Sequence, residues 1–222
     1  LALDRIGSPQ KKSLGMARQL PNSSAKNEKI FPFKSYYASE NKYYIIMTRK
    51  QRLIFCITGA IFTIGFGALS HFFYEWSGFN RAVRVFFAAN ESVWEHLKLA
   101  IFPTLIFFAV GMFFVDSKNL PFCLFVTLAV PMLVIPSVFY TYTAFTQKSI
   151  IAVDILTYIL SVSAAYALAY LILKIPPVKR WINLLSLIGI GAIVVMYMTF
   201  TLNPPKCPLF LDETKNVYGL IK

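Results

Sequence analysis

The chain has 222 residues, of which 57% are hydrophobic, 16% are aromatic and only 14% are charged, and its mean hydropathy is +0.59. Soluble domains carry about 25% charged residues, so this composition excludes an ordinary soluble protein and predicts an all-α integral membrane bundle. The net charge of +12 sits partly in a basic flank beside the apolar segments, which favours membrane topology or contact with anionic lipid, and no nucleic acid partner is expected.

Residues 1–46 are polar and keep neither a helical nor a strand period, which predicts a disordered or loosely attached basic arm. Met47 is followed by Thr-Arg-Lys-Gln-Arg and then by the first apolar run, as at a translation start. The arm would then lie upstream of the natural start, and residues 47–222 would form the membrane domain.

Five apolar runs follow, each close to the roughly 20 residues that a helix needs to cross the hydrocarbon layer. They predict helices, because backbone polar groups in lipid must be paired within their own segment. Pro103, Pro131 and Pro136 should kink the second and third helices, so neighbouring helices must satisfy the freed carbonyls. The predicted spans are residues 53–75, 97–115, 120–142, 150–173 and 182–202.

The first span carries a stripe of residues four positions apart, a spacing that puts them on one helix face. Its small members allow close approach of a partner helix, so the stripe should turn its last two members into the bundle. The next segment, 77–89, is too short to span and is apolar on one side, which predicts an interfacial helix. The stripe consists of Gly59, Thr63, Gly67, His71 and Glu75.

Four ionisable residues open the second span. Glu91, Glu95 and Lys98 form an i, i+4, i+7 row, and His96 lies about 100° round the helix. A simple helix start is one interpretation, since Ser92-Val-Trp-Glu95 fits a capping box, with the tryptophan as an interfacial anchor and the lysine reaching towards the headgroups. That interpretation leaves His96 and the separate His71/Glu75 pair unexplained.

Further polar residues occur at the fourth span and in the tail. Asp154, Tyr158 and Ser161 share one face of the fourth span. The tail, residues 203–222, contains three prolines and carries Asp212, so we expect it to be extended and to return across the same face.

The positive-inside rule gives the orientation. Arg49, Lys50 and Arg52 flank the start of the first span, and the basic loop at residues 174–180 falls on the same side after four crossings. We therefore expect a multi-pass protein of the cytoplasmic membrane, with its amino terminus in the cytoplasm and its carboxyl terminus outside.

This topology brings both histidines and most acidic residues of the membrane domain to the outer face. Two imidazoles with carboxylates suit a divalent metal ion such as Zn, Fe or Mn. A hydrogen-bonded ion cluster without metal is the competing interpretation. The core candidates are His71, Glu75, Glu91, Glu95 and His96; the second tier is Lys98, Tyr140, Asp154 and Asp212.

Three sets of residues resemble a family of small bacterial multi-pass proteins of unknown function. They are His71-x-x-Tyr74-Glu75, the Asn-Glu-Ser-x-Trp-Glu-His-x-Lys block at 90–98, and the Pro-Pro-x-x-Pro-Leu-Phe-x-Asp tail at 204–212 with Tyr218-Gly219 beyond it. The resemblance covers roughly residues 47–222. It implies an architecture and a site location but no activity.

Three functions remain open at this point. The first is binding or transport of an ion or small polar solute, which predicts a polar row running inward from Asp154 through Tyr158 and Ser161. The second is a metal-dependent membrane hydrolase of a lipid or lipid-linked substrate, with Glu91 or Glu95 as base. The third is a structural or assembly role. Phosphate-binding loops, dinucleotide fingerprints and the Gly-x-Ser-x-Gly elbow are absent from the sequence.

Overall fold

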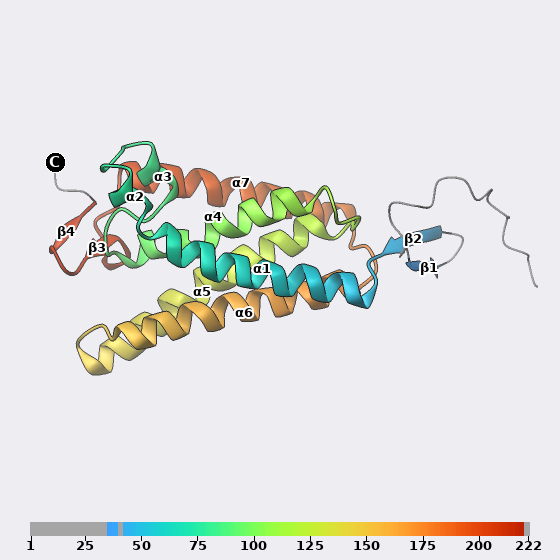
Figure 1. The fold of residues 1–222 in the computed structure, drawn as a ribbon, viewed down its shortest axis with the longest axis horizontal. Helices are drawn as coiled ribbons and strands as arrows, with labels where there is room; N and C mark the ends of the chain where they lie inside the picture. Colours follow the sequence, from blue (N-terminus) through green and yellow to red (C-terminus); the bar gives the residue numbers. More distant parts are fainter. Residues whose placement is uncertain (1–34, 40–41, 220–222) are drawn as a thin grey trace, which may run out of the picture. The chain divides into compact units, whose positions relative to one another are not determined.

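The structure is a computed structural model that describes residues 35–39 and 42–219 (Figure 1). The larger part of the predicted arm, residues 1–34, lies outside the described residues. Within the remainder of that arm, β1 (Ser35–Ser39) and β2 (Lys42–Ile46) pair as an antiparallel hairpin, with Ser35 opposite Ile46 and Ser39 opposite Lys42.

Five helices dominate the chain after Met47. Each is long and apolar enough to cross a membrane, so the prediction of an all-α, multi-pass membrane protein is confirmed. The helices are α1 (Arg49–Ser70), α4 (Val93–Gly111), α5 (Leu120–Thr146), α6 (Ile151–Lys174) and α7 (Arg180–Leu202). Consecutive spans run in opposite directions, which brings the start of α1, the α4–α5 loop and the α6–α7 loop to one end of the bundle (Figure 1).

Helix α4 is the centre of the bundle. In its most apolar window 61% of residues are buried, against 17–33% in the other four spans, whose outer faces are therefore left for lipid. One core cluster joins α4 to α1 and α6 around Phe55, Phe108 and Tyr166. A second joins α4 to α5, α7 and the tail, where Trp94 stacks on Tyr197 at 4.3 Å between ring centroids. Trp94 is thus a buried core residue, and its prediction as an interfacial anchor is wrong.

The proline inside α4 is accommodated by a neighbouring helix. Pro103 has no amide hydrogen, so the carbonyl four residues earlier, that of Leu99, loses its helical partner. The hydroxyl of Tyr158 on α6 lies 3.1 Å from this oxygen and 2.8 Å from the Thr63 carbonyl on α1. Gly67 makes room for this arrangement, because a Cβ there would collide with the Tyr158 hydroxyl and with the Leu99 carbonyl. Three helices are therefore joined one turn before His71.

Replacing Gly67 by alanine is expected to destabilise the bundle by about 1–3 kcal/mol, the usual cost of overpacking, because the added methyl must displace Tyr158 or the α4 backbone. Gly65→Ala on the same helix is the matched control, since its Cβ would meet nothing within 4 Å. That change should be neutral or slightly stabilising. Thermal unfolding in detergent compares the two, and equal midpoints would contradict the close approach at Gly67.

The first predicted span, 53–75, runs five residues past the end of helix α1. Helix α1 ends at Ser70, whose hydroxyl donates to the Gly67 carbonyl at 2.8 Å and so competes with the helical bonds of the last turn. The buried stripe of Gly59, Thr63 and Gly67 is present, but Glu75 lies beyond the helix end and is exposed. Its predicted place on the stripe is wrong.

The segment between the first two spans differs from the single interfacial helix predicted at 77–89. It forms two one-turn helices, α2 (Phe73–Trp76) and α3 (Val83–Phe86), with Gly78 and Phe79 at positive φ between them. Exposed aromatic side chains at Phe72, Trp76 and Phe79 give this segment an apolar surface.

The tail is not simply extended. It forms the 3₁₀ turn η1 (Pro208–Phe210) and an antiparallel pair of β3 (Leu211–Asp212) and β4 (Val217–Tyr218). Phe210 is buried against Trp94, which fixes the tail beside the start of α4.

Candidate functional site

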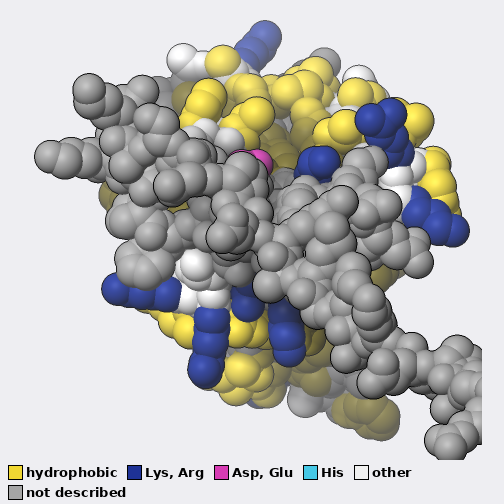
Figure 2. Space-filling view, turned by 90° about the vertical axis from the view of Figure 1, so that its right-hand side faces the viewer, with side chains coloured by type: hydrophobic (Ala, Val, Ile, Leu, Met, Phe, Trp, Pro, Cys, Tyr) yellow, Lys and Arg dark blue, Asp and Glu magenta, His cyan; other side chains and the backbone are white. Residues whose placement is uncertain are grey.

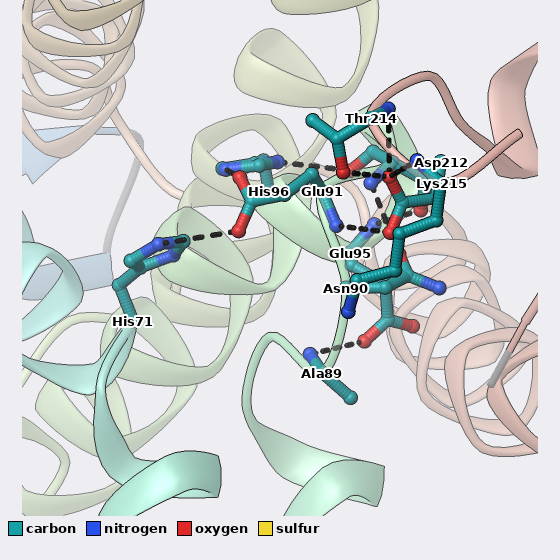
Figure 3. Close-up of polar contacts among 10 residues, drawn as sticks. His71, Ala89, Asn90, Glu91, Glu95, His96, Asp212, Thr214 and Lys215 are labelled. Atoms are coloured by element: carbon teal, nitrogen blue, oxygen red, sulfur yellow. Dashed lines mark hydrogen bonds and ion pairs between the residues drawn. The ribbon is translucent and has the colours of Figure 1, made fainter. Parts of the chain in front are cut away.

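Three of the predicted residues meet where α1 ends and α4 begins (Figure 3). His71 is the residue after the last of α1, Glu91 precedes the N-cap of α4, and His96 lies in the first turn of α4. Glu91 bridges the imidazoles: its Oε1 is 3.7 Å from His71 Nε2 and its Oε2 is 3.4 Å from His96 Nε2. The rings stack at 5.2 Å between centroids with an interplanar angle of 24°. We call these residues the His71–Glu91–His96 group.

The tautomer of His96 follows from its second ring nitrogen. Nδ1 lies 2.9 Å from the carbonyl oxygen of Ser92, which can only accept, so Nδ1 carries the proton. In the neutral imidazole, Nε2 then presents a lone pair to the Glu91 carboxylate. Two such acceptors 3.4 Å apart repel each other unless a proton or a metal ion lies between them. A second proton on the His96 ring or a metal ion between the two atoms would remove this repulsion.

The electrostatics favour a carboxylate at Glu91 and a neutral imidazole at His71, the forms in which these two residues bind metal. A hydrogen bond from His96, which forms when Nε2 also carries a proton, lowers the pKa of Glu91 below its ordinary value, so Glu91 is a carboxylate at neutral pH. Burial, followed by the proximity of His96, lowers the pKa of His71 and keeps its imidazole neutral. His71 Nδ1 is buried and has no hydrogen-bond partner among the described residues.

The dimensions of the group suit a metal ion. One ligand atom from each residue lies within 4.8 Å of the others. Metal–ligand distances of about 2.0–2.2 Å in a tetrahedral site place ligand atoms about 3.4 Å apart, which is the separation of His96 Nε2 and Glu91 Oε2; His71 Nε2 lies 3.7 Å from the other carboxylate oxygen, Oε1. Two His and one Glu is a donor set for Zn, Fe or Mn.

Asp212 lies beside Glu91, to its right in Figure 3, and holds its backbone. Its Oδ2 accepts the Glu91 amide at 3.3 Å, while Oδ1 accepts the Thr214 amide and hydroxyl and the Lys215 amide. Burial alone would raise the pKa of Asp212, but these hydrogen bonds outweigh it and lower the pKa below its usual value. The tail returns to this face as predicted, and its Asp212 is an ionised carboxylate that holds the backbone of Glu91.

The start of α4 is capped by Ser92, but only half of the predicted capping box forms. Ser92 Oγ accepts the Glu95 amide at 3.3 Å, whereas the Ser92 amide donates to Asn90 Oδ1 at 3.0 Å instead of to Glu95. Asn90 Nδ2 also donates to the Gly219 carbonyl at 3.1 Å, a second link to the tail.

Glu95 is engaged in a different interaction. Its Oε2 accepts from Lys98 Nζ at 2.8 Å and from the Ala89 amide at 2.9 Å, and Lys98 also donates to the Arg84 carbonyl at 2.7 Å. The side chains of Lys98 and Glu95 are only 0% and 6% exposed. This buried ion pair fastens the segment after α2 to α4, so the predicted row of Glu91, Glu95 and Lys98 divides into two sites, and Lys98 does not extend towards the headgroups.

The other candidates lie outside the His71–Glu91–His96 group. Glu75 is exposed. Asp154 accepts a hydrogen bond from the Tyr142 hydroxyl at 2.6 Å. The Tyr140 hydroxyl is buried and has no hydrogen-bond partner among the described residues.

Sequence reasoning missed the groups that orient this site. The Ser92 carbonyl fixes the His96 tautomer, and the i, i+4 spacing of the two residues was a readable signal for it. Asn90 contacts Gly219, 129 residues later, and a contact at this distance leaves no local pattern. Thr214 acts through Asp212, two residues before it, and Asp212 in turn reaches Glu91 across 121 residues.

Comparison with known proteins adds a family but no activity. No curated protein and no solved structure matches the chain. A family profile described as a family of unknown function (DUF6512) matches residues 42–220, which contain all five spans, the His71–Glu91–His96 group and the tail. The resemblance to a multi-pass family without known activity is therefore confirmed, and the chain belongs to the family of unknown function DUF6512.

Proposed function

We propose that this protein binds a divalent transition-metal ion, Zn, Fe or Mn, through His71, Glu91 and His96 at one face of the membrane. The observation that carries the proposal is the approach of His96 Nε2 to Glu91 Oε2 at 3.4 Å while Nδ1 donates to the Ser92 carbonyl. A metal ion would resolve the repulsion between the two acceptors, and a histidine whose other nitrogen donates to a backbone carbonyl is the usual arrangement of a metal ligand.

The group leaves room for a further ligand. The side chains of His71, Glu91 and His96 are 30%, 46% and 36% exposed, so solvent reaches the site. Three protein ligands with one open position are typical of sites that bind water or an exchangeable ligand, whereas structural zinc sites are closed by four protein ligands. This supports binding of the ion together with a small polar ligand.

A metal-dependent membrane hydrolase acting on a lipid or lipid-linked substrate is the second candidate. The open position and the exposed aromatic residues Phe72, Trp76 and Phe79 favour it. It ranks second because Glu95, a candidate base, is already held by Lys98 and by the Ala89 amide.

Transport through the bundle has less support than binding at its face. A path inward would need free polar groups along α6. The hydroxyls of Tyr158 and Ser161 instead donate to backbone carbonyls, and Asp154 is held by Tyr142. These polar groups are occupied by hydrogen bonds within the protein. Among the described residues, they therefore do not form the free polar row along α6 that a transport path would need.

We propose further that the group faces the outside of the cytoplasmic membrane, with the amino terminus in the cytoplasm and the carboxyl terminus outside. Support comes from the cations at the opposite end of the bundle, where the positive-inside rule predicts the cytoplasmic side. They include Arg49 and Lys50 at the start of α1 and Lys174, Lys179 and Arg180 around the α6–α7 loop.

Elemental analysis of the full chain purified in detergent without chelator tests the metal proposal. We expect about one equivalent of Zn, Fe or Mn per chain, lost in Glu91→Gln because the amide is a much weaker ligand than the carboxylate. Glu75→Gln is the matched control, since this exposed residue contributes no atom to the group and its loss should leave the metal in place.

Metal retained in Glu91→Gln at the wild-type level would contradict the ligand assignment. If the folded wild-type protein takes up none of the three metals after they are added, the proposal fails, and a proton shared between His96 and Glu91, with a structural role, becomes the better explanation.

A further inference from the structure

The charges of the described residues 47–219 are distributed unequally between the two ends of the bundle. The end that bears the His71–Glu91–His96 group has as many acids as cations: Glu75, Glu91, Glu95, Asp154, Asp212 and Glu213 against Arg81, Arg84, Lys98, Lys148, Lys206 and Lys215. The opposite end, which we call the basic end, has one acid, Asp116. Its cations are Arg49, Lys50, Arg52, Lys118, Lys174, Lys179 and Arg180, and Figure 2 shows Lys and Arg side chains around this face.

Three cations of the basic end, Lys174, Lys179 and Arg180, have no acidic partner among the described residues. Three ion pairs lie at the other end of the bundle: His71 and His96 with Glu91, and Lys98 with Glu95. Lys174, Lys179 and Arg180 are exposed and join none of them. The charges of these three side chains are therefore available to a partner outside the described residues.

The loop that carries these cations is held in one conformation. Asn119, buried in the α4–α5 loop, donates through Nδ2 to the carbonyls of Ile172, Ile175 and Pro176 and accepts the Val178 amide at 2.8 Å. This clamp spans the α6–α7 connection. Because these bonds already order the backbone of the loop, binding a partner there costs little backbone entropy, and the cations extend from a prearranged backbone.

The position of the cations identifies the partner. Trp181 follows Arg180 directly and is 57% exposed, and the exposed leucines Leu184, Leu185 and Leu187 continue along α7. Tryptophan at the boundary between cations and a lipid-facing helix surface marks the level of the headgroups. Cations fixed at that level meet phospholipid headgroups before any soluble partner.

We infer that the basic end binds the headgroups of acidic phospholipids in the adjacent leaflet, with Lys174, Lys179 and Arg180 as the main contacts. Each cation near an anionic membrane surface raises the affinity about fivefold, and the effect is screened by salt. The inference does not depend on a metal at the other end of the bundle.

Trp181 can report the lipid around it. The full chain with Trp76→Phe retains Trp181 as its exposed tryptophan, because Trp94 is buried within the protein. The protein is placed in mixed vesicles of phosphatidylglycerol and phosphatidylcholine, and in each of two samples a different one of these lipids carries brominated acyl chains. Bromine quenches the fluorescence of Trp181, so the ratio of quenching in the two samples gives the relative affinity of this end of the protein for the two lipids. Identical leaflets make the result independent of the direction of insertion.

We expect phosphatidylglycerol to be preferred by about fivefold or more at low salt, and the preference to fall with added salt. The triple variant Lys174→Gln/Lys179→Gln/Arg180→Gln should bring the ratio close to one. The matched control Arg81→Gln/Lys148→Gln/Lys206→Gln removes three exposed cations from the other end and should keep the wild-type ratio. Circular dichroism verifies that each variant is folded.

If the two brominated lipids quench Trp181 equally in the Trp76→Phe protein, in which Lys174, Lys179 and Arg180 are unchanged, the inference is overturned. A preference that persists in the folded Lys174/Lys179/Arg180 triple variant, or one that salt does not change, would overturn it as well.

Discussion

Replacing His96 by alanine is expected to weaken metal binding by more than about 100-fold. The substitution removes one of three ligands, whereas changes to groups that only orient a ligand typically cost 10- to 100-fold. Competition between the protein and chelating dyes of graded affinity measures the dissociation constant of each metal. The fold should survive, because the His96 side chain is partly exposed and its contacts, with the Ser92 carbonyl, Glu91 and the His71 ring, all lie at the end of the bundle.

Asp212→Asn provides the matched comparison for His96→Ala. Asp212 touches the backbone of Glu91 and not the ligand atoms, so its loss should weaken metal binding by about 10- to 100-fold, less than the loss of His96. If His96→Ala binds metal as tightly as the wild type, the ion does not lie between His96 and Glu91. An Asp212→Asn effect as large as that of His96→Ala would show that the tail supplies a ligand itself.

The second large effect is expected at Lys98. Lys98→Met leaves the Glu95 carboxylate buried without its cation, and breaking a buried pair in this way costs about 3–5 kcal/mol. Unfolding of the detergent-solubilised protein by denaturant measures the loss of stability. A loss below about 1 kcal/mol would be the behaviour of an exposed ion pair and would contradict the burial of Lys98.

The double variant Lys98→Met/Glu95→Gln separates the charge from the packing. It removes both charges and keeps similar volumes, so it should be more stable than Lys98→Met alone. Metal content should change little in either folded variant, because neither side chain belongs to the His71–Glu91–His96 group. Loss of metal from the folded double variant would mean that the two sites are coupled.

Glu91 and Glu95 show why similar residues one turn apart take different roles. Both were predicted on one helical row. Helix α4 begins at Val93, so Glu91 precedes the helix and its direction is set by Asp212 and the tail. Glu95 lies inside the helix, where Lys98 three residues later and the Ala89 amide are within reach. The helix boundary decided which carboxylate meets the histidines.

The sequence by itself determined the five membrane spans and the end of the bundle at which the ionisable residues gather. Both depend on local properties: a run of about 20 apolar residues needs no distant contact to be recognised, and alternate crossing then assigns each loop to a side. The need for a neighbour at Pro103 was also readable, because the missing amide hydrogen is a property of proline itself.

Only the tertiary structure decided the partners of each polar side chain. The early end of α1 separated Glu75 from His71, and Tyr158 was selected as the donor to Leu99 because Gly67 lets α1, α4 and α6 approach closely. Asp212 reached Glu91 through the fold of the tail. Helix ends and the relative rotation of helices depend on packing summed over many residues. A binding site needs its side chains placed to about half an ångström. Residue spacing therefore predicted where this site lies but not which side chains contact one another.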